Sequence, residues 1–109
     1  MIIDFNNIEE EAIAHFKGGE DETHVRMFFD GVNRIMKGRL RPGASIGRHK
    51  HEAGCEVIFI TKGCGHVLYD GSMLPVTAGS VHYCPKGHEH SLINDSSADL
   101  EFAAVVAQQ

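Results

Sequence analysis

The chain has 109 residues, of which 42% are hydrophobic and 23% are charged, and it contains 12 glycines and 8 histidines. Its formal net charge of −5 leaves no basic stripe to neutralise phosphates, which argues against nucleic acid as a partner. No apolar run approaches the roughly 20 residues that a bilayer-spanning helix needs. We therefore expect one domain over residues 1–109, without a membrane partner.

The first residues and the cysteines indicate the compartment. The N-terminal sequence MIIDFNNIEEE lacks a basic segment and becomes acidic at once, which disfavours a signal peptide. Cys55, Cys64 and Cys84 are odd in number and widely spaced, which is typical of reduced thiols rather than of a disulfide framework. These features predict a cytoplasmic protein.

The N-terminal part of the chain has a different pattern from the rest. Residues 8–16 place Ile8, Ala12, Ile13 and Phe16 at helical spacing, which predicts a short amphipathic helix capped by Asn7. The polar segment 17–23 that follows is predicted to be a loop.

From residue 24 onward, short apolar runs alternate with turn signals. Strands are expected at 24–29, 32–40, 46–51, 56–61, 65–69, 73–76, 81–84, 88–93 and 100–106. Asp30-Gly31 and Asp70-Gly71 are favourable hairpin turns between them. The pattern predicts an all-β fold, a closed sandwich or barrel, with no linker that would divide it.

The stretch from Gly43 to Gly63 carries three candidate metal ligands. His49 and His51 are two residues apart on an expected strand and point to one face, and Glu56 can reach the same point from the next strand. Imidazole and carboxylate groups suit Fe, Mn, Ni, Zn or Cu, and nothing in the sequence selects one of these divalent ions.

A second stretch, from Gly79 to Asn94, supplies a further histidine. His90 lies on the expected strand that follows a Pro-x-Gly turn. Because two strand pairs that are distant in sequence can face one barrel interior, His90 could be the fourth group at the same point.

Together the two stretches resemble the two sequence motifs of the cupin superfamily. The first motif is Gly, five residues, His-x-His, three or four residues, Glu, six residues and Gly, and its positions are filled by Gly43, His49, His51, Glu56 and Gly63. The second is Gly, five residues, Pro-x-Gly, two residues, His, three residues and Asn, and its positions are filled by Gly79, Pro85, Gly87, His90 and Asn94. Ser80 departs from the aspartate that many members carry after the second-motif glycine.

The resemblance implies a double-stranded β-helix, a jelly-roll barrel with motif one at 43–63 and motif two at 79–94. It also implies one divalent metal ion held by His49, His51, Glu56 and His90. On an octahedral ion four protein ligands leave two positions for a substrate or for O₂. A homodimer is implied as well, and residues 1–16 are the segment that we expect to add to a partner's sheet.

Catalysis in such a site requires an acid or a base near the metal, and the candidates are His66, His82, Tyr83 and His88. In the alternative interpretation, His66 and His82 lie in the pocket rim or the core and His88 lies on an exposed turn. Three arginines could likewise form a patch for an anionic substrate or simply a solvated face; they are Arg39, Arg41 and Arg48.

Two functions remain open at this point, because the fold of this family does not decide the reaction. The first is a metal-dependent enzyme, a dioxygenase or an isomerase, acting on a small polar or anionic metabolite. The alternative is a non-catalytic module that binds a small ligand or a metal. A purely structural barrel is disfavoured, since four intact ligands are costly to keep buried without use.

Overall fold

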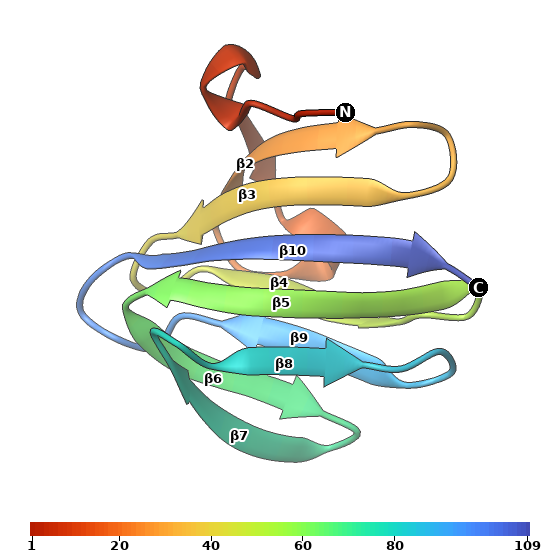
Figure 1. The fold of residues 1–109 in the computed structure, drawn as a ribbon. Coiled ribbons are helices and arrows are strands. Elements are labelled where there is room, and N and C mark those ends of the chain that lie inside the picture. Colours follow the sequence, from red (N-terminus) through yellow and green to blue (C-terminus); the bar gives the residue numbers. More distant parts are fainter.

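The computed structural model describes all residues, 1–109, and consists almost entirely of β-strands (Figure 1). The strands are β1 (Glu11–Ala14), β2 (Glu22–Phe29), β3 (Arg34–Leu40), β4 (Ser45–Lys50), β5 (Gly54–Lys62), β6 (Cys64–Tyr69), β7 (Ser72–Thr77), β8 (Val81–Cys84), β9 (Glu89–Ile93) and β10 (Leu100–Gln108). Two short 3₁₀ turns, η1 (Phe5–Asn7) and η2 (Phe16–Gly18), lie near the N-terminus. None of the helical segments could span a bilayer.

The strands form two antiparallel sheets that face each other. One sheet has the order β1-β2-β3-β10-β5-β8 and the other has the order β4-β9-β6-β7. In Figure 1 the six-stranded sheet lies in front, with β4 and β9 visible behind it. The predicted all-β jelly-roll fold is therefore confirmed.

Side chains that alternate along the strands fill the space between the sheets. Ile58 and Ile60 on β5 and Leu100, Phe102 and Ala104 on β10 are all at most 3% exposed. These residues share the two-residue spacing of a strand with one buried face. They belong to one cluster of 13 buried apolar residues, which joins both sheets and forms the floor under the site described below.

Residues 8–16 do not form the predicted amphipathic helix. Residues 11–14 form strand β1 instead, and Ile13 pairs opposite Thr23 of β2. A helix of this length is marginal in water, whereas the edge of β2 offers backbone partners and a place for Ile13 and Phe16 against the core. Asp4, not Asn7, caps the short turn η1. Because β1 pairs within its own chain, the homodimer through residues 1–16 stays a prediction.

Strand β4 contains an extra residue that changes which way its side chains point. Ile46 pairs with Leu92 of β9, but His49 pairs with His90, so the register shifts between these two pairs. Without the shift, Ile46 and His49 would lie on opposite faces, because they are an odd number of residues apart. The irregularity around Gly47 therefore turns His49 toward the interior that Ile46 also faces.

The turn η2 lies directly on this irregular part of β4. A Cβ atom on Gly47 would come within 1.9 Å of the Lys17 carbonyl oxygen, and one on Gly19 would come within 1.9 Å of the Ser45 carbonyl oxygen. Only glycine permits such a backbone approach. Lys17 itself has a left-handed backbone with φ of 55°, which is uncommon for a residue other than glycine. This contact holds η2 over the site.

Candidate metal centre

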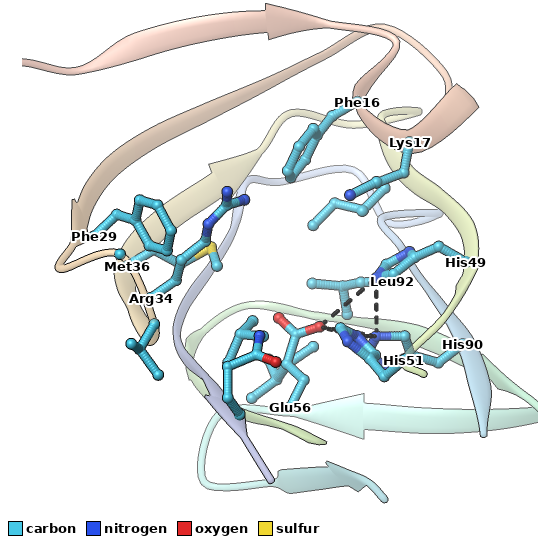
Figure 2. Close-up of a pocket in the computed structure, with 16 residues that line it drawn as sticks. Phe16, Lys17, Phe29, Arg34, Met36, His49, His51, Glu56, His90 and Leu92 are labelled. Carbon is cyan, nitrogen blue, oxygen red and sulfur yellow. Dashed lines mark hydrogen bonds and ion pairs between the residues drawn. The ribbon is translucent and has the colours of Figure 1, made fainter. Parts of the chain in front are cut away.

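Four side chains from two sheets converge on one point. The Nε2 atom of His90 lies 3.0 Å from His51 Nε2 and 3.2 Å from His49 Nε2. The Oε1 atom of Glu56 lies 2.8 Å from His90 Nε2 and 3.0 Å from His51 Nε2. Figure 2 shows the four groups together at one side of a cavity. The four residues named by the sequence motifs are thus brought together.

The donor atoms are arranged as one metal ion would require. Two donors bound at right angles to one ion, each about 2.1 Å away, lie about 3 Å apart. Four of the separations among these groups, 2.8 to 3.2 Å, match that value, and His49 Nε2 lies 3.8 Å from Glu56 Oε1. All the donor atoms lie within 4.8 Å of one another. The cluster is therefore suited to binding a metal ion.

The protonation of the cluster also favours a cation. Burial by itself would raise the pKa of Glu56, but the close contacts of its carboxylate with His49, His51 and His90 outweigh burial and hold this pKa well below its usual value. The His49 ring donates from Nδ1 to the Gly47 carbonyl oxygen at 2.7 Å, which leaves its Nε2 lone pair free. The site thus offers a charged carboxylate and a His49 ring whose orientation is fixed by the Gly47 carbonyl.

His82 supports the cluster from behind and does not line the cavity. Its Nε2 atom lies 2.9 Å from Nδ1 of His90, on the side of that ring away from Glu56. A His90 ring that offers its Nε2 lone pair to an ion carries its proton on Nδ1, and it donates this proton to His82. Burial, with a smaller contribution from nearby His90, lowers the pKa of His82 to about 4, so it is neutral and can accept.

Cys84 lies close to His82 and His90, within 4.8 Å of their donor atoms. It is fully buried, and burial raises the pKa of its thiol to about 11. The thiol is therefore protonated at neutral pH and has little nucleophilic character.

The other predicted acid-base candidates lie outside the cavity. Tyr83 is 53% exposed on the outer face of β8. His88 bonds through Nδ1 to Asp70 Oδ2 at 2.5 Å and lies 3.2 Å from the Tyr69 hydroxyl. His66 pairs with Asp95 at 2.8 Å on the outside of the four-stranded sheet. None of these side chains lines the cavity beside the metal cluster.

The cavity has a volume of about 410 Å³, and its walls contain residues that the sequence did not indicate. The lining residues that carry charge, apart from the four in the cluster, are Lys17 and Arg34. Lys17 falls in a segment predicted to be only a polar loop. The predicted arginine patch does not reach the cavity, since none of Arg39, Arg41 and Arg48 lines it. Arg39 pairs with Glu10 and Arg48 with Glu89 instead.

The sequence and the fold are similar to those of known proteins. A family model described as "Cupin domain" matches residues 36–106. The chain is 33% identical to an oxalate-binding protein of Thermotoga maritima over 112 residues, which covers 97% of this chain and 93% of that protein.

Two solved structures extend this similarity. A predicted oxalate decarboxylase from Thermotoga maritima superposes with a TM-score of 0.92 at 31% identity, and the match covers 100% of both chains. A sugar phosphate isomerase of the cupin superfamily from Silicibacter pomeroyi superposes with a TM-score of 0.82 over 100% of this chain and 76% of that one. Its identity of 22% means that this second similarity shows the fold alone. Because the matched residues 36–106 exceed half of the chain and contain both motifs, the chain belongs to the cupin family.

Proposed function

We propose that this protein binds a small carboxylate anion of the oxalate class at a divalent metal ion held by His49, His51, Glu56 and His90. The observation that carries the proposal is that these donors converge at one side of a cavity, which we call its inner end. The other charged groups that line the cavity, Lys17 and Arg34, are both cations. The metal, when bound, supplies a Lewis acid that adjacent carboxylate oxygens can chelate. The names of the related Thermotoga proteins, which mention oxalate, point to the same chemistry.

The charges of the cavity agree with a dianion. One carboxylate does not neutralise a divalent ion, so the inner end keeps a net positive charge. Lys17 and Arg34 add positive charge farther along the cavity. A chelating dianion would neutralise these positive charges. The rest of the lining is mainly apolar, so electrostatic attraction between ligand and cavity is strong there.

Binding is favoured over turnover by the lack of proton donors in the cavity. Apart from Glu56 and the three histidines, the lining contains no carboxyl, phenol, thiol or imidazole group. The cavity thus offers few groups that could give a proton to a reacting anion. Dioxygenase and isomerase activities stay predictions, and ligand binding is the function that the residues support best.

The proposal is tested by titrating metal-free protein with Mn²⁺, Fe²⁺, Ni²⁺, Zn²⁺ and Cu²⁺, with Fe²⁺ added under anaerobic conditions. We expect about one ion per chain for at least one metal, and loss of that binding in the His49→Ala/His90→Ala double variant. The loaded protein is then titrated with oxalate by calorimetry, with acetate as the ligand that cannot chelate. Oxalate should bind at least about tenfold more tightly than acetate, because it uses two donor atoms on one ion.

Two results would overturn the proposal. The first is the failure of every tested ion to bind the wild-type protein at a defined stoichiometry. The second is a loaded protein that binds neither oxalate nor a 2-oxo acid more tightly than acetate. A matched His66→Ala/His88→Ala double variant, which removes two histidines outside the cavity, should bind metal as the wild type does.

A further inference from the structure

Lys17 and Arg34 are cations without an anionic partner in the structure. Neither side chain takes part in an ion pair or a side-chain hydrogen bond, although the chain carries an excess of acidic residues. Each is instead placed against an aromatic ring. The Lys17 Nζ atom is 5.7 Å from the centre of the Phe16 ring, and the Arg34 guanidinium carbon is 4.7 Å from the centre of the Phe29 ring.

Some other cations of the chain have partners; Lys37, Arg41 and Lys50 also have none, but they do not line the cavity. Arg39 binds Glu10 through two hydrogen bonds and lies 3.6 Å from Asp99, and Lys62 lies 3.7 Å from Glu101. Arg26 donates to the Phe5 and Ile8 carbonyl oxygens. A cation–π contact orients a charged group but leaves its hydrogen-bond donors free. Lys17 and Arg34 are therefore positioned without being neutralised.

Both side chains extend into the cavity at its more exposed end. Figure 2 shows them reaching inward from opposite walls below Phe16, with Lys17 on the same side as His49 and Arg34 across the cavity from it. We call this end the mouth and define it by Phe16, Lys17, Phe29, Val32 and Arg34. Phe29 and Val32 are 52% and 54% exposed, so the mouth also presents apolar surface.

The wall between the two ends is apolar. It is lined by the side chains of Met36, Ile46, Ile58, Leu92 and Val106. A cavity of about 410 Å³ falls in the range of sites that enclose drug-sized ligands. Oxalate, the smallest dicarboxylate, would fill only part of this volume and leave much of the apolar wall without a contact.

We propose that the preferred ligand is an extended chelating dicarboxylate, a 2-oxo or 2-hydroxy acid whose second carboxylate lies several bonds from the first. Its chelating end binds at the metal cluster, its carbon chain passes along the apolar wall, and its distal carboxylate is held between Lys17 and Arg34. This proposal rests on the proposed function, because it needs the metal end to bind a carboxylate. It adds a second anion subsite that selects ligands by length.

The test compares 2-oxo acids that differ only at the distal end. Protein loaded with the metal found above is titrated with 2-oxoglutarate and with 2-oxopentanoate, in which a methyl group replaces the distal carboxylate. The same is done with the next longer pair, 2-oxoadipate and 2-oxohexanoate. In at least one pair the dicarboxylate should bind about ten- to a hundredfold more tightly, since a charge-assisted contact to two cations is lost in the methyl analogue.

Variants show whether the gain comes from the mouth. In the Lys17→Met/Arg34→Met double variant, the ratio of the two dissociation constants within a pair should fall to about twofold or less, while metal content stays at the wild-type level. Lys37→Met is the matched control, because it removes an exposed cation from the same strand as Arg34 that does not line the cavity. It should leave the ratio as in the wild type.

The outcomes separate this inference from the proposed function. If oxalate binds but neither dicarboxylate binds more tightly than its methyl analogue, the second subsite does not exist and the proposed function stands. A gain that persists in the double variant would also overturn the subsite. If oxalate and all four 2-oxo acids fail to bind the loaded protein, the proposed function itself has failed, and the inference falls with it.

Discussion

The inner end of the cavity and its mouth are constructed in different ways. The inner end takes its four donor groups from β4, β9, the start of β5 and the residue just after β4, all anchored by paired strands. The mouth takes its cations and aromatic rings from the turn η2 and from the facing ends of β2 and β3. Figure 2 shows Arg34 and Phe29 across the space from the donor groups, and Lys17 above His49.

The difference implies a division of labour between the two ends. A metal site needs its donor atoms within a few tenths of an ångström of their ideal positions, and paired strands supply that rigidity. A mouth that selects ligands needs less regular shape, and turns can supply it. The mouth is nevertheless held firmly here, because the Gly19 and Gly47 backbones let η2 lie directly on β4.

The largest effect is expected when the inner end alone is broken. Glu56→Gln keeps the shape of the side chain but removes the anionic ligand of the cluster. Metal affinity should fall by more than about 100-fold, beyond the range typical for loss of an outer hydrogen-bond partner. Competition with a chelator of known affinity measures the change. Hydrogen exchange at η2 should stay as in the wild type, and wild-type metal affinity would contradict the role of Glu56.

Gly47→Ala should displace η2 and with it the mouth, and it should also disturb His49, whose ring bonds to the Gly47 carbonyl oxygen. The added methyl group would collide with the Lys17 carbonyl oxygen, so η2 must lift away from β4. We expect a loss of about 1 to 3 kcal/mol in the free energy of unfolding by urea, as for other overpacked sites. Affinity for the extended dicarboxylate should fall further than affinity for metal. Ser45→Ala removes only the hydrogen bond to the Glu20 amide and should cost less.

Low pH should destabilise the inner end, because His82, which contacts His90 there, has a lowered pKa. Burial lowers the pKa of His82 to about 4 in the folded protein, whereas an unperturbed histidine, as in the unfolded chain, has a pKa of 6.5. Between these two pH values the unfolded chain therefore binds more protons than the folded protein. The stability of metal-free protein should therefore fall as the pH decreases from about 6.5 to about 4, by up to about 3 kcal/mol from this group.

His82→Gln is the variant that isolates this contribution. Urea unfolding of both proteins between pH 7.5 and 4.5, a range that spans most of the titration, gives the difference between them. The wild type should lose stability more steeply than the variant as the pH falls. Equal slopes in the two proteins would show that His82 takes up its proton at an ordinary pKa in the folded state.

The smallest effect is expected outside both ends of the cavity. The ring of His66 pairs with Asp95 at 2.8 Å, but both side chains are substantially exposed. His66→Ala should change the free energy of unfolding by less than about 0.5 kcal/mol, because surface pairs contribute little. Metal and ligand affinities should not change in calorimetric titrations. A weakened metal site would show that the outer sheet face communicates with the inner end.

Several sequence expectations were right because they depend on local pattern. The strands from β2 onward lie within a few residues of their predicted bounds, since apolar alternation and glycine turns report them directly. The predicted helix over 8–16 was wrong because Ile8, Ala12, Ile13 and Phe16 match a helical spacing that a nearby sheet edge outcompetes. The residue spacing within one segment does not indicate which other segments will pair with it in the folded chain.

The catalytic candidates illustrate the same limit. His82, Tyr83 and His88 were chosen for their chemistry and for their proximity to His90 in the sequence. On β8, successive side chains point to opposite faces, so Tyr83 points outward and His82 inward. His82 contacts the His90 ring on the side away from Glu56 and therefore does not line the cavity. Their catalytic roles stay untested predictions, and the cavity contains none of the three.

The sequence by itself determined the all-β fold and the four donor residues, because motif spacing and strand periodicity are local properties of the chain. Tertiary structure alone decided that Ile46 and His49 face the same interior, since the extra residue of β4 appears only when the strand pairs with β9. It alone placed Lys17 and Arg34 in one cavity, because η2 packs on β4 and the cavity brings this turn together with the start of β3, segments that no local pattern connects. The sequence motifs thus predict the inner end, whereas the mouth can be recognised only from the packing of the folded chain.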